Sequence, residues 1–234
     1  MEFSKLSAPT LKELFIREME SMILSGQLAV GERLPSEREL AEQMQVSRAV
    51  VNGGISDLAR KGFLHVKPRA GVYVADYRRT GTPETIRSIM EYNGGRLRPE
   101  EIRSILEIKL IFDQLAVEQA IPMLTEEGLA ALEGLLAELE RAQAPQAVAE
   151  AAFAFYHELT LLGSNTLIPL IYQAFRVPNL TLWAQFARRD GNRAIYENAA
   201  RVFHAIRVRD IATARENIRA TLTPLMEREE GRYR

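Results

Sequence analysis

The spacing of apolar residues divides this chain into two parts with different predicted structures. Between residues 34 and 62 the apolar positions recur every three or four residues, which is typical of short amphipathic helices. From 63 to 74 two short runs rich in β-branched and aromatic residues flank a polar segment, which predicts a hairpin. From residue 84 onward the helical spacing returns, without the alternation that is typical of strands. The predicted fold class is therefore mainly α.

The first two helices of this pattern have recognisable start signals. Ser36 precedes a helical run and Glu39 follows it by three residues, which is the spacing of a capping box. Gln45 and Val46 are expected to form a tight turn, after which the hydroxyl of Ser47 can cap the next helix. The pattern predicts a helix, a turn and a second helix in direct succession.

The second of these helices is expected to have one outer and one inner face. Residues on the first turns of a helix that enters a DNA major groove meet the edges of the bases. The residues expected on this outer face are Arg48, Ala49, Val51 and Asn52. Those expected to face the core are Val50, Ile55 and Leu58, and Gly62 is expected to end the helix.

The predicted hairpin has a cationic tip. Its strands are expected over 63–66 and 72–74, joined by Lys67-Pro68-Arg69-Ala70-Gly71. The whole chain has a net charge of −1, but residues 44–79 contain seven Lys or Arg against two Asp. A local basic face is what attraction to phosphate requires. Two helices followed by a two-stranded basic wing form an architecture that places one helix in a major groove.

Residues 10–76 resemble the winged-helix domain of GntR-type bacterial transcription regulators. The matching motifs are a lead helix over 11–24, GQLAVGERLPSERELA at 26–41, VSR at 46–48 and GVYV at 71–74. The resemblance implies that Arg38, Ser47, Arg48 and the wing tip around Arg69 and Gly71 contact DNA. Together with the outer helix face, the candidate DNA-binding residues are Arg38, Ser47, Arg48, Ala49, Asn52, Lys67, Arg69 and Gly71.

The chain departs from this family inside the second helix. The family usually has an arginine and then a glutamate there, whereas this chain has Asn52 followed by Gly53 and Gly54. A glycine inside a helix costs about 1 kcal/mol relative to alanine. The helix is therefore expected to be looser or to approach the DNA backbone more closely. Asparagine pairs with adenine and arginine with guanine, so the operator is expected to differ from the usual half-site.

Composition excludes several classes of protein. The 234 residues include no cysteine, which excludes disulfides, thiol catalysis and cysteine-bound zinc. The hydrophobic fraction of 47% and the charged fraction of 26% are those of a globular protein. We find no apolar run long enough to span a membrane and no signal-peptide pattern. The expected location is the bacterial cytoplasm, in association with the nucleoid.

A polar, turn-rich segment at 77–83 is predicted to link two domains, 1–76 and 84–234. The second domain is expected to be an all-α helical bundle for effector binding and dimerisation. Its first helix is expected over 84–92, closed by Asn93-Gly94-Gly95. The others are expected over 99–122, 125–145, 146–162, 167–188 with a bend at Pro178, 192–208 and 210–229.

This layout resembles the effector domain of the FadR subgroup of GntR regulators. Two motifs carry the resemblance: Phe155-Tyr156-His157 followed by GSNTL at 163–167, and Arg103 three residues before Leu106-Glu107. Most such domains bind a divalent metal through one aspartate and three histidines. The aspartate lies one helical turn before the first histidine, and this chain has Phe153 at that place.

The remaining ligands implied by the resemblance are incomplete as well. His157 fits the first histidine and His204 the second, but the last one falls near Thr221. Two neutral imidazoles leave a divalent cation uncompensated, so we expect no metal cofactor. His157 and His204 can equally be ordinary histidines of the core.

An organic effector is expected in place of the metal. Phe153, Tyr156, Leu159, Trp183 and Phe186 would form an apolar pocket, although such stripes are usually just core. The subgroup's namesake senses long-chain acyl-CoA and also lacks the metal ligands, so a fatty acyl thioester is a candidate. The candidate effector-binding residues are Arg103, Phe153, Tyr156, His157 and His204.

We interpret the chain as a homodimeric transcription regulator that binds a palindromic operator and responds to a small molecule. Both repression and activation agree with the sequence, although repressor is the working assignment. Three alternatives remain open: a metal-dependent sensor of organic acids in the same family, a winged helix that contacts only proteins, and an enzyme using His157, Glu158 and His204. The enzyme is disfavoured because no nucleophile, phosphate loop or complete metal set is present.

Overall fold

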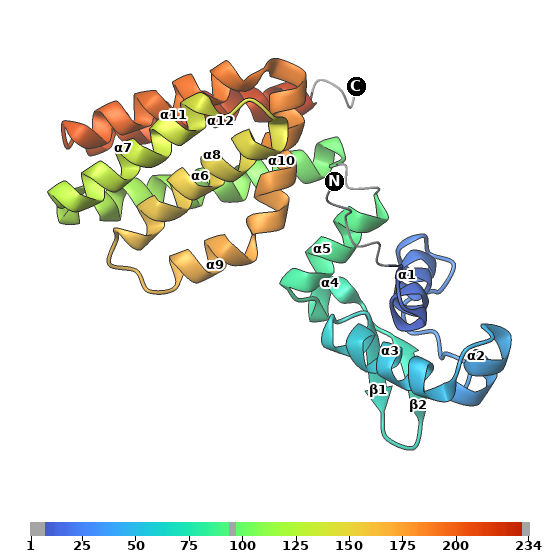
Figure 1. The fold of residues 1–234 in the computed structure, drawn as a ribbon. Coiled ribbons are helices and arrows are strands. Elements are labelled where there is room, and N and C mark those ends of the chain that lie inside the picture. Colours follow the sequence, from blue (N-terminus) through green and yellow to red (C-terminus); the bar gives the residue numbers. More distant parts are fainter. Residues whose placement is uncertain (1–7, 94–96, 231–234) are drawn as a thin grey trace, which may run out of the picture. The chain divides into compact units, whose positions relative to one another are not determined.

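The structure is a computed structural model that describes residues 8–93 and 97–230. The chain divides into two compact units, Met1–Gly94 and Gly95–Arg234, and each is described by itself. Figure 1 shows the elements of both units coloured along the sequence. Within the described residues, no helix has the length and apolar character needed to cross a membrane.

The first unit is a winged helix-turn-helix, as predicted. Its helices are α1 (Leu11–Leu24), α2 (Glu37–Gln43), α3 (Arg48–Arg60), α4 (Tyr77–Thr80) and α5 (Pro83–Tyr92), and its strands are β1 (Leu64–Lys67) and β2 (Gly71–Val74). The two strands pair antiparallel, with Leu64 opposite Val74 and Lys67 opposite Gly71. Residues 31–34 extend this small sheet, since the amide of Leu34 donates to the carbonyl of Val72 over 2.9 Å.

The start signals read from the sequence form as expected. Ser36 and Glu39 complete the predicted capping box on α2. Thr10 and Glu13 form a second one on α1, which the sequence analysis did not identify. Hydrogen bonds from Ser36 lower the pKa of the Glu39 carboxyl. Gly62 adopts a φ of 80° directly after the end of α3, a left-handed conformation that glycine tolerates without strain.

The boundary between the units differs from the expected linker at 77–83. Helices α4 and α5 belong to the first unit, where the buried Thr85, Ser88 and Met90 of α5 pack beside α1. The sequence analysis placed residues 84–92 in the second domain. They belong to the first unit because the hydroxyl groups of Thr85 and Ser88 contact Lys61 and Glu20. Asn93 caps the end of α5, whereas Gly94 and Gly95 lie outside the described residues.

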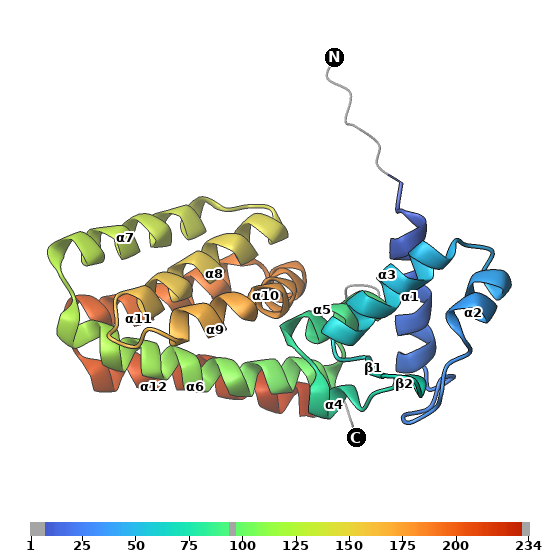
Figure 2. The same ribbon diagram turned by 90° about the horizontal axis from the view of Figure 1, so that it is seen from below.

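The second unit is built from helices, as predicted. They are α6 (Pro99–Met123), α7 (Glu126–Arg141), α8 (Pro145–Leu161), α9 (Ile168–Ala174), α10 (Arg176–Asp190), α11 (Asn192–Arg207) and α12 (Ile211–Glu230). Helices α6 and α12 lie side by side along much of their length (Figure 2). Helix α8 packs against α6, α7, α10 and α11, and its Val148, Ala149, Phe155 and Leu159 are fully buried.

One helix of the second unit was predicted wrongly. The expected single helix over 167–188 is two helices, α9 and α10, separated at Phe175 instead of bent at Pro178. Pro178 lies in the first turn of α10. Its missing N–H has no consequence there, because the first amides of a helix have no partner within the helix.

Candidate nucleic-acid interface

Helix α3 begins at a cap that the sequence identified. Ser47 has an extended backbone, and its hydroxyl accepts a hydrogen bond of 3.3 Å from the amide of Val50. Gln45, in the turn before it, has a φ of 53°, which lets the chain reverse between α2 and α3. The side chain of Ser47 is therefore engaged in starting the helix, and its exposed position remains open to a DNA contact.

The outer face of α3 agrees with the sequence analysis at three of four positions. Arg48, Ala49 and Asn52 are exposed. Val51 was expected beside them, but it is fully buried in the core, whereas Val50 is only partly buried. Each residue turns a helix by about 100°, so exchanging two neighbours moves a side chain from one face to the other.

Gly53 and Gly54 have a structural role that the sequence did not reveal. A Cβ atom on Gly54 would lie 2.3 Å from Cδ1 of Phe15 in α1, and one on Gly53 would lie 3.2 Å from Cδ of Lys12. The two glycines thus let α1 and α3 approach closely. The structure does not bear out the expectation that they bring the helix closer to the DNA backbone, because Gly54 is buried toward α1.

The wing presents its cations at an exposed tip. Lys67 lies over the ring of Tyr73, 4.6 Å from the centroid. Arg69 has a φ of 63°, and Gly71 has a φ of 117°, so the tip turns through left-handed backbone. A Cβ on Gly71 would lie 2.9 Å from Nε of Arg33, and the left-handed backbone at this position favours glycine. At Gly71 the wing therefore adjoins the guanidinium of a further arginine, Arg33.

Two residues of this face were missed by the sequence analysis. Arg33 is exposed and adjoins the wing at Gly71, and Glu37 starts α2 and accepts a hydrogen bond of 3.1 Å from Nδ2 of Asn52. Both line an open groove of about 730 Å³ between the wing and the start of α2. No local sequence pattern identifies them, because Arg33 lies beside Gly71 and Glu37 bonds to Asn52, and both partners are distant in sequence. Arg38, on α2, is exposed and lies 3.8 Å from Glu42.

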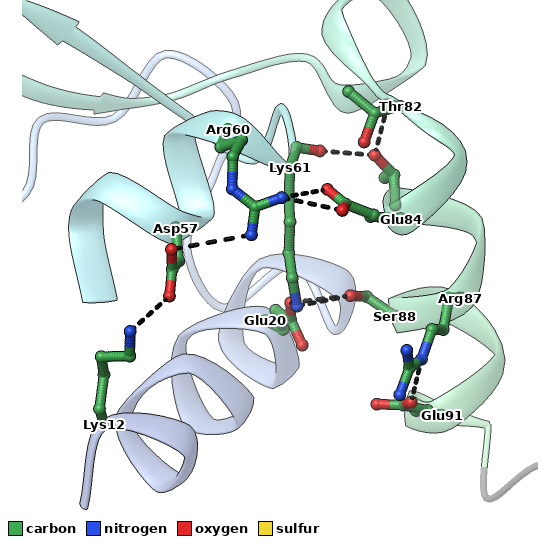
Figure 3. Close-up of polar contacts among 11 residues, drawn as sticks. Lys12, Glu20, Asp57, Arg60, Lys61, Thr82, Glu84, Arg87, Ser88 and Glu91 are labelled. Carbon is green, nitrogen blue, oxygen red and sulfur yellow. Dashed lines mark hydrogen bonds and ion pairs between the residues drawn. The ribbon is translucent and has the colours of Figure 1, made fainter. Parts of the chain in front are cut away.

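Polar contacts behind α3 hold its last turn in place (Figure 3). The ammonium of Lys61 donates to Glu20 of α1 over 2.7 Å and to Ser88 of α5 over 3.2 Å. Arg60 donates to both carboxylate oxygens of Glu84. Figure 3 also shows Asp57 of α3 joined to Lys12 of α1. These contacts anchor α3 to both neighbouring helices.

The second unit contains a buried polar cluster. Lys109 and Asp113 form an ion pair of 2.8 Å on α6 in which each side chain is 1% exposed. The hydroxyl of Tyr172 accepts from Lys109 over 2.7 Å and donates to Asp113 over 3.1 Å. The Lys109 ammonium also lies 4.0 Å from the ring centroid of Tyr156 and 5.3 Å from that of Trp183. Burial lowers the pKa of Lys109 and raises that of Asp113.

The candidate effector residues do not all meet in this unit. Phe153 and Tyr156 are buried and His157 is half-buried, with the His157 ring stacked on Phe153 at 5.5 Å. Arg103 is ion-paired with Glu107 on the exposed face of α6, and His204 is exposed on α11, 3.5 Å from Arg207. The residues expected to line an apolar pocket, Leu159, Trp183 and Phe186, are buried as core.

The metal ligands implied by the resemblance do not assemble into a site. In the described part of the chain, no three His, Cys, Asp or Glu side chains are grouped so that they could hold an ion. His157 shares a contact of 3.2 Å with the carbonyl of Pro169, and His204 is exposed. Thr221 donates its hydroxyl to the carbonyl of Asn217. These residues therefore do not fit the expected ligand set.

Comparison with known proteins connects both units to transcription regulators. Residues 12–74 match the model for bacterial regulatory proteins of the gntR family, and residues 104–223 match the FCD domain. The HTH-type transcriptional regulator LutR of Bacillus subtilis is 25% identical over 211 residues, which cover 86% of this chain and 93% of LutR. Mce2R of Mycobacterium tuberculosis, another HTH-type transcriptional regulator, is 27% identical over 180 residues, covering 75% and 73%.

The fold has a counterpart among solved structures. The structure of Lar, described as controlling expression of the Listeria monocytogenes agr system, superimposes with a TM-score of 0.67 at 17% identity. The superposition covers 96% of this chain and 99% of Lar. The FCD match also agrees with the resemblance to the FadR subgroup. The chain belongs to the gntR family of bacterial regulatory proteins, as a DNA-binding transcription regulator with an FCD domain, and is not an enzyme.

Proposed function

We propose that the outer face of α3 and the wing bind duplex DNA through Arg38, Ser47, Arg48, Ala49, Asn52, Lys67, Arg69 and Gly71. The observation that carries the proposal is the exposure of Arg48 and Asn52 on the first turns of α3 while Val51 and Leu58 anchor its opposite face. In this proposal α3 contacts the edges of the bases, and Lys67 and Arg69 contact the phosphates of the DNA backbone.

The test is operator affinity of the full chain after a change of one exposed arginine. Arg48→Ala should cost about 1–3 kcal/mol, because it removes a guanidinium from the reading face without a core contact. Arg87→Ala is the matched control, since Arg87 is also exposed in the first unit but pairs with Glu91 on α5. Equal affinities of wild type and Arg48→Ala would contradict the assignment of α3.

We also propose that the protein acts as a homodimer on a palindromic operator. One winged helix contacts one half-site, and a two-fold dimer places two such helices about one turn of DNA apart. Sedimentation at micromolar concentration, with and without a selected operator, should show two chains per complex. A monomer under both conditions would contradict this part of the proposal.

The effector is proposed to be an organic molecule with an extended apolar part, such as a fatty acyl thioester, held beside Phe153, Tyr156 and His157. Two buried polar atoms on α10, the helix that packs against α8, indicate that the ligand also carries a polar group. Asn179 Oδ1 and Trp183 Nε1 have no hydrogen-bond partner among the described atoms. Such atoms are costly when unpaired. Arg103 and His204 are exposed, so we propose no direct role for them in this enclosed region.

Trp183 gives this proposal a direct readout, because it is the only tryptophan in the chain. Its fluorescence should change on titration with long-chain acyl thioesters and not with short organic acids. His157→Ala should weaken that response without altering the oligomeric state. A response to short organic acids alone would favour the alternative of an organic-acid sensor, and elemental analysis of the same sample would then test for a bound metal.

A further inference from the structure

Asn52 and Glu37 connect the reading helix to the helix before it. Asn52 is exposed on α3, and its Nδ2 donates a hydrogen bond of 3.1 Å to Oε1 of Glu37 at the first position of α2. The other carboxylates of α2 are engaged elsewhere: Glu39 accepts from Ser36, and Glu42 lies beside Arg38. Glu37 thus faces the side chain that we propose to read a base.

The contact determines which way the Asn52 amide is turned. A carboxylate only accepts hydrogen bonds, so the nitrogen of the amide, and not its oxygen, must face Glu37. Without such a partner an exposed asparagine can rotate its amide by half a turn, which exchanges its donor and its acceptor. Glu37 itself is half-buried at the start of α2, where the helix dipole favours a negative charge.

The atoms left over on Asn52 match one base. Nδ2 has a second hydrogen to donate, and Oδ1 is left as an acceptor. In the major groove adenine offers an acceptor at N7 and a donor at N6, which is the complementary pair. A reversed amide would place the Nδ2 donor against the N6 donor of adenine, and the Oδ1 acceptor against its N7 acceptor. Both hydrogen bonds would then be lost.

We infer that Glu37 is a positioning residue that sets base preference by fixing the Asn52 amide in the orientation that pairs with adenine. The inference rests on the proposed binding of DNA by α3 and extends it to a residue that does not itself touch the base. Glu37 is also expected to lower the affinity for every DNA sequence, because its carboxylate repels the nearby phosphates.

The experiment is selection from a randomised duplex library with the full-length wild-type chain, followed by affinity measurements on single-base variants of the selected site. Asn52→Ala should lose preference for adenine at one position of each half-site by roughly fivefold or more. Glu37→Gln should reduce that same preference by at least about threefold, because glutamine accepts either orientation of the amide, and should raise affinity for all sequences. Glu18→Gln on the exposed face of α1 removes the same charge and should leave the preference unchanged.

The outcomes separate this inference from the proposed function. Unchanged base preference in Glu37→Gln, with preference lost in Asn52→Ala, would overturn the positioning role while leaving α3 as the reading helix. A change confined to a cytosine at a different position would show that Glu37 reads a base directly, and would also overturn it. Failure of the wild-type chain to select any sequence would instead contradict the proposed function.

Discussion

Two sets of charged residues, one in each unit, act in opposite ways. In the first unit the cations of the proposed DNA-binding face, Arg48, Lys67 and Arg69, are exposed over a small apolar core. In the second unit a lysine and an aspartate, Lys109 and Asp113, lie inside the core. Exposed charges act on a partner through long-range attraction, whereas a buried pair acts on the fold, because each charge needs the other.

The comparison is sharpest on helix α6, which carries both kinds of pair. Arg103 and Glu107 are four residues apart and about half exposed, and Lys109 and Asp113 have the same spacing but are buried. The spacing alone therefore does not tell a surface pair from an interior one. Their neighbours decide, since Lys109 is enclosed by Tyr156, Tyr172 and Trp183.

The largest expected effect is on the buried pair. Lys109→Met should destabilise the second unit by about 3–5 kcal/mol, because it leaves the Asp113 carboxylate buried without its cation. Arg103→Met, the control on the same helix, should cost less than about 1 kcal/mol. Urea unfolding followed by Trp183 fluorescence measures both. Equal stability of the two variants would show that the buried and exposed pairs do not differ in this way.

The next largest effect is expected on stability when a glycine of each unit is replaced by alanine. Gly54→Ala should destabilise the first unit by about 1–3 kcal/mol, because the new Cβ would meet the Phe15 ring. Gly134→Ala, on the exposed face of α7 with nothing within 4 Å, should stabilise the second unit by up to about 1 kcal/mol. Hydrogen exchange resolved by segment would assign each change to its unit. A stabilising Gly54→Ala would contradict close packing of α1 on α3.

A smaller effect is expected at the wing. Lys67→Gln and Arg69→Gln should each weaken binding to all sequences and reduce the slope of log affinity against log salt by about one. Affinity measured at several salt concentrations between roughly 50 and 200 mM determines the slope. A loss limited to one base position would mean that the wing reads sequence, and the division of labour between α3 and the wing would have to be revised.

The smallest effect concerns pH. The hydrogen bond from Lys12 holds the pKa of Asp57 below its ordinary value of 3.8. A depressed pKa means that the contribution to stability is present above pH 3.8 and is lost as the pH falls from there through the lowered value. Asp57→Asn should therefore flatten the acid dependence of first-unit unfolding in that window. An unchanged profile would assign acid unfolding to other carboxyl groups.

Local signals made much of the first unit predictable. Capping at Ser36 and Ser47, the stop at Gly62 and the alternation of the wing strands depend on neighbours within a few residues. The outer face of α3 followed from these elements, whereas other candidate DNA contacts, such as Arg38 and Gly71, came from the resemblance to GntR-type regulators. The positions of Val50 and Val51 were exchanged, since a helical face is decided by contacts with α1 that the sequence does not show.

The sequence by itself determined the helix-turn-helix, the basic wing and the all-helical second half, because hydrogen bonding and side-chain periodicity within each segment specify them. Only the tertiary structure decided what depends on partners distant in sequence. Gly54 is needed because Phe15 lies against it, and α5 joins the first unit because Ser88 meets Glu20 and Lys61. In the same way, Lys109 and Asp113 are buried because aromatic rings from other helices close over a pair whose spacing resembles that of a surface salt bridge.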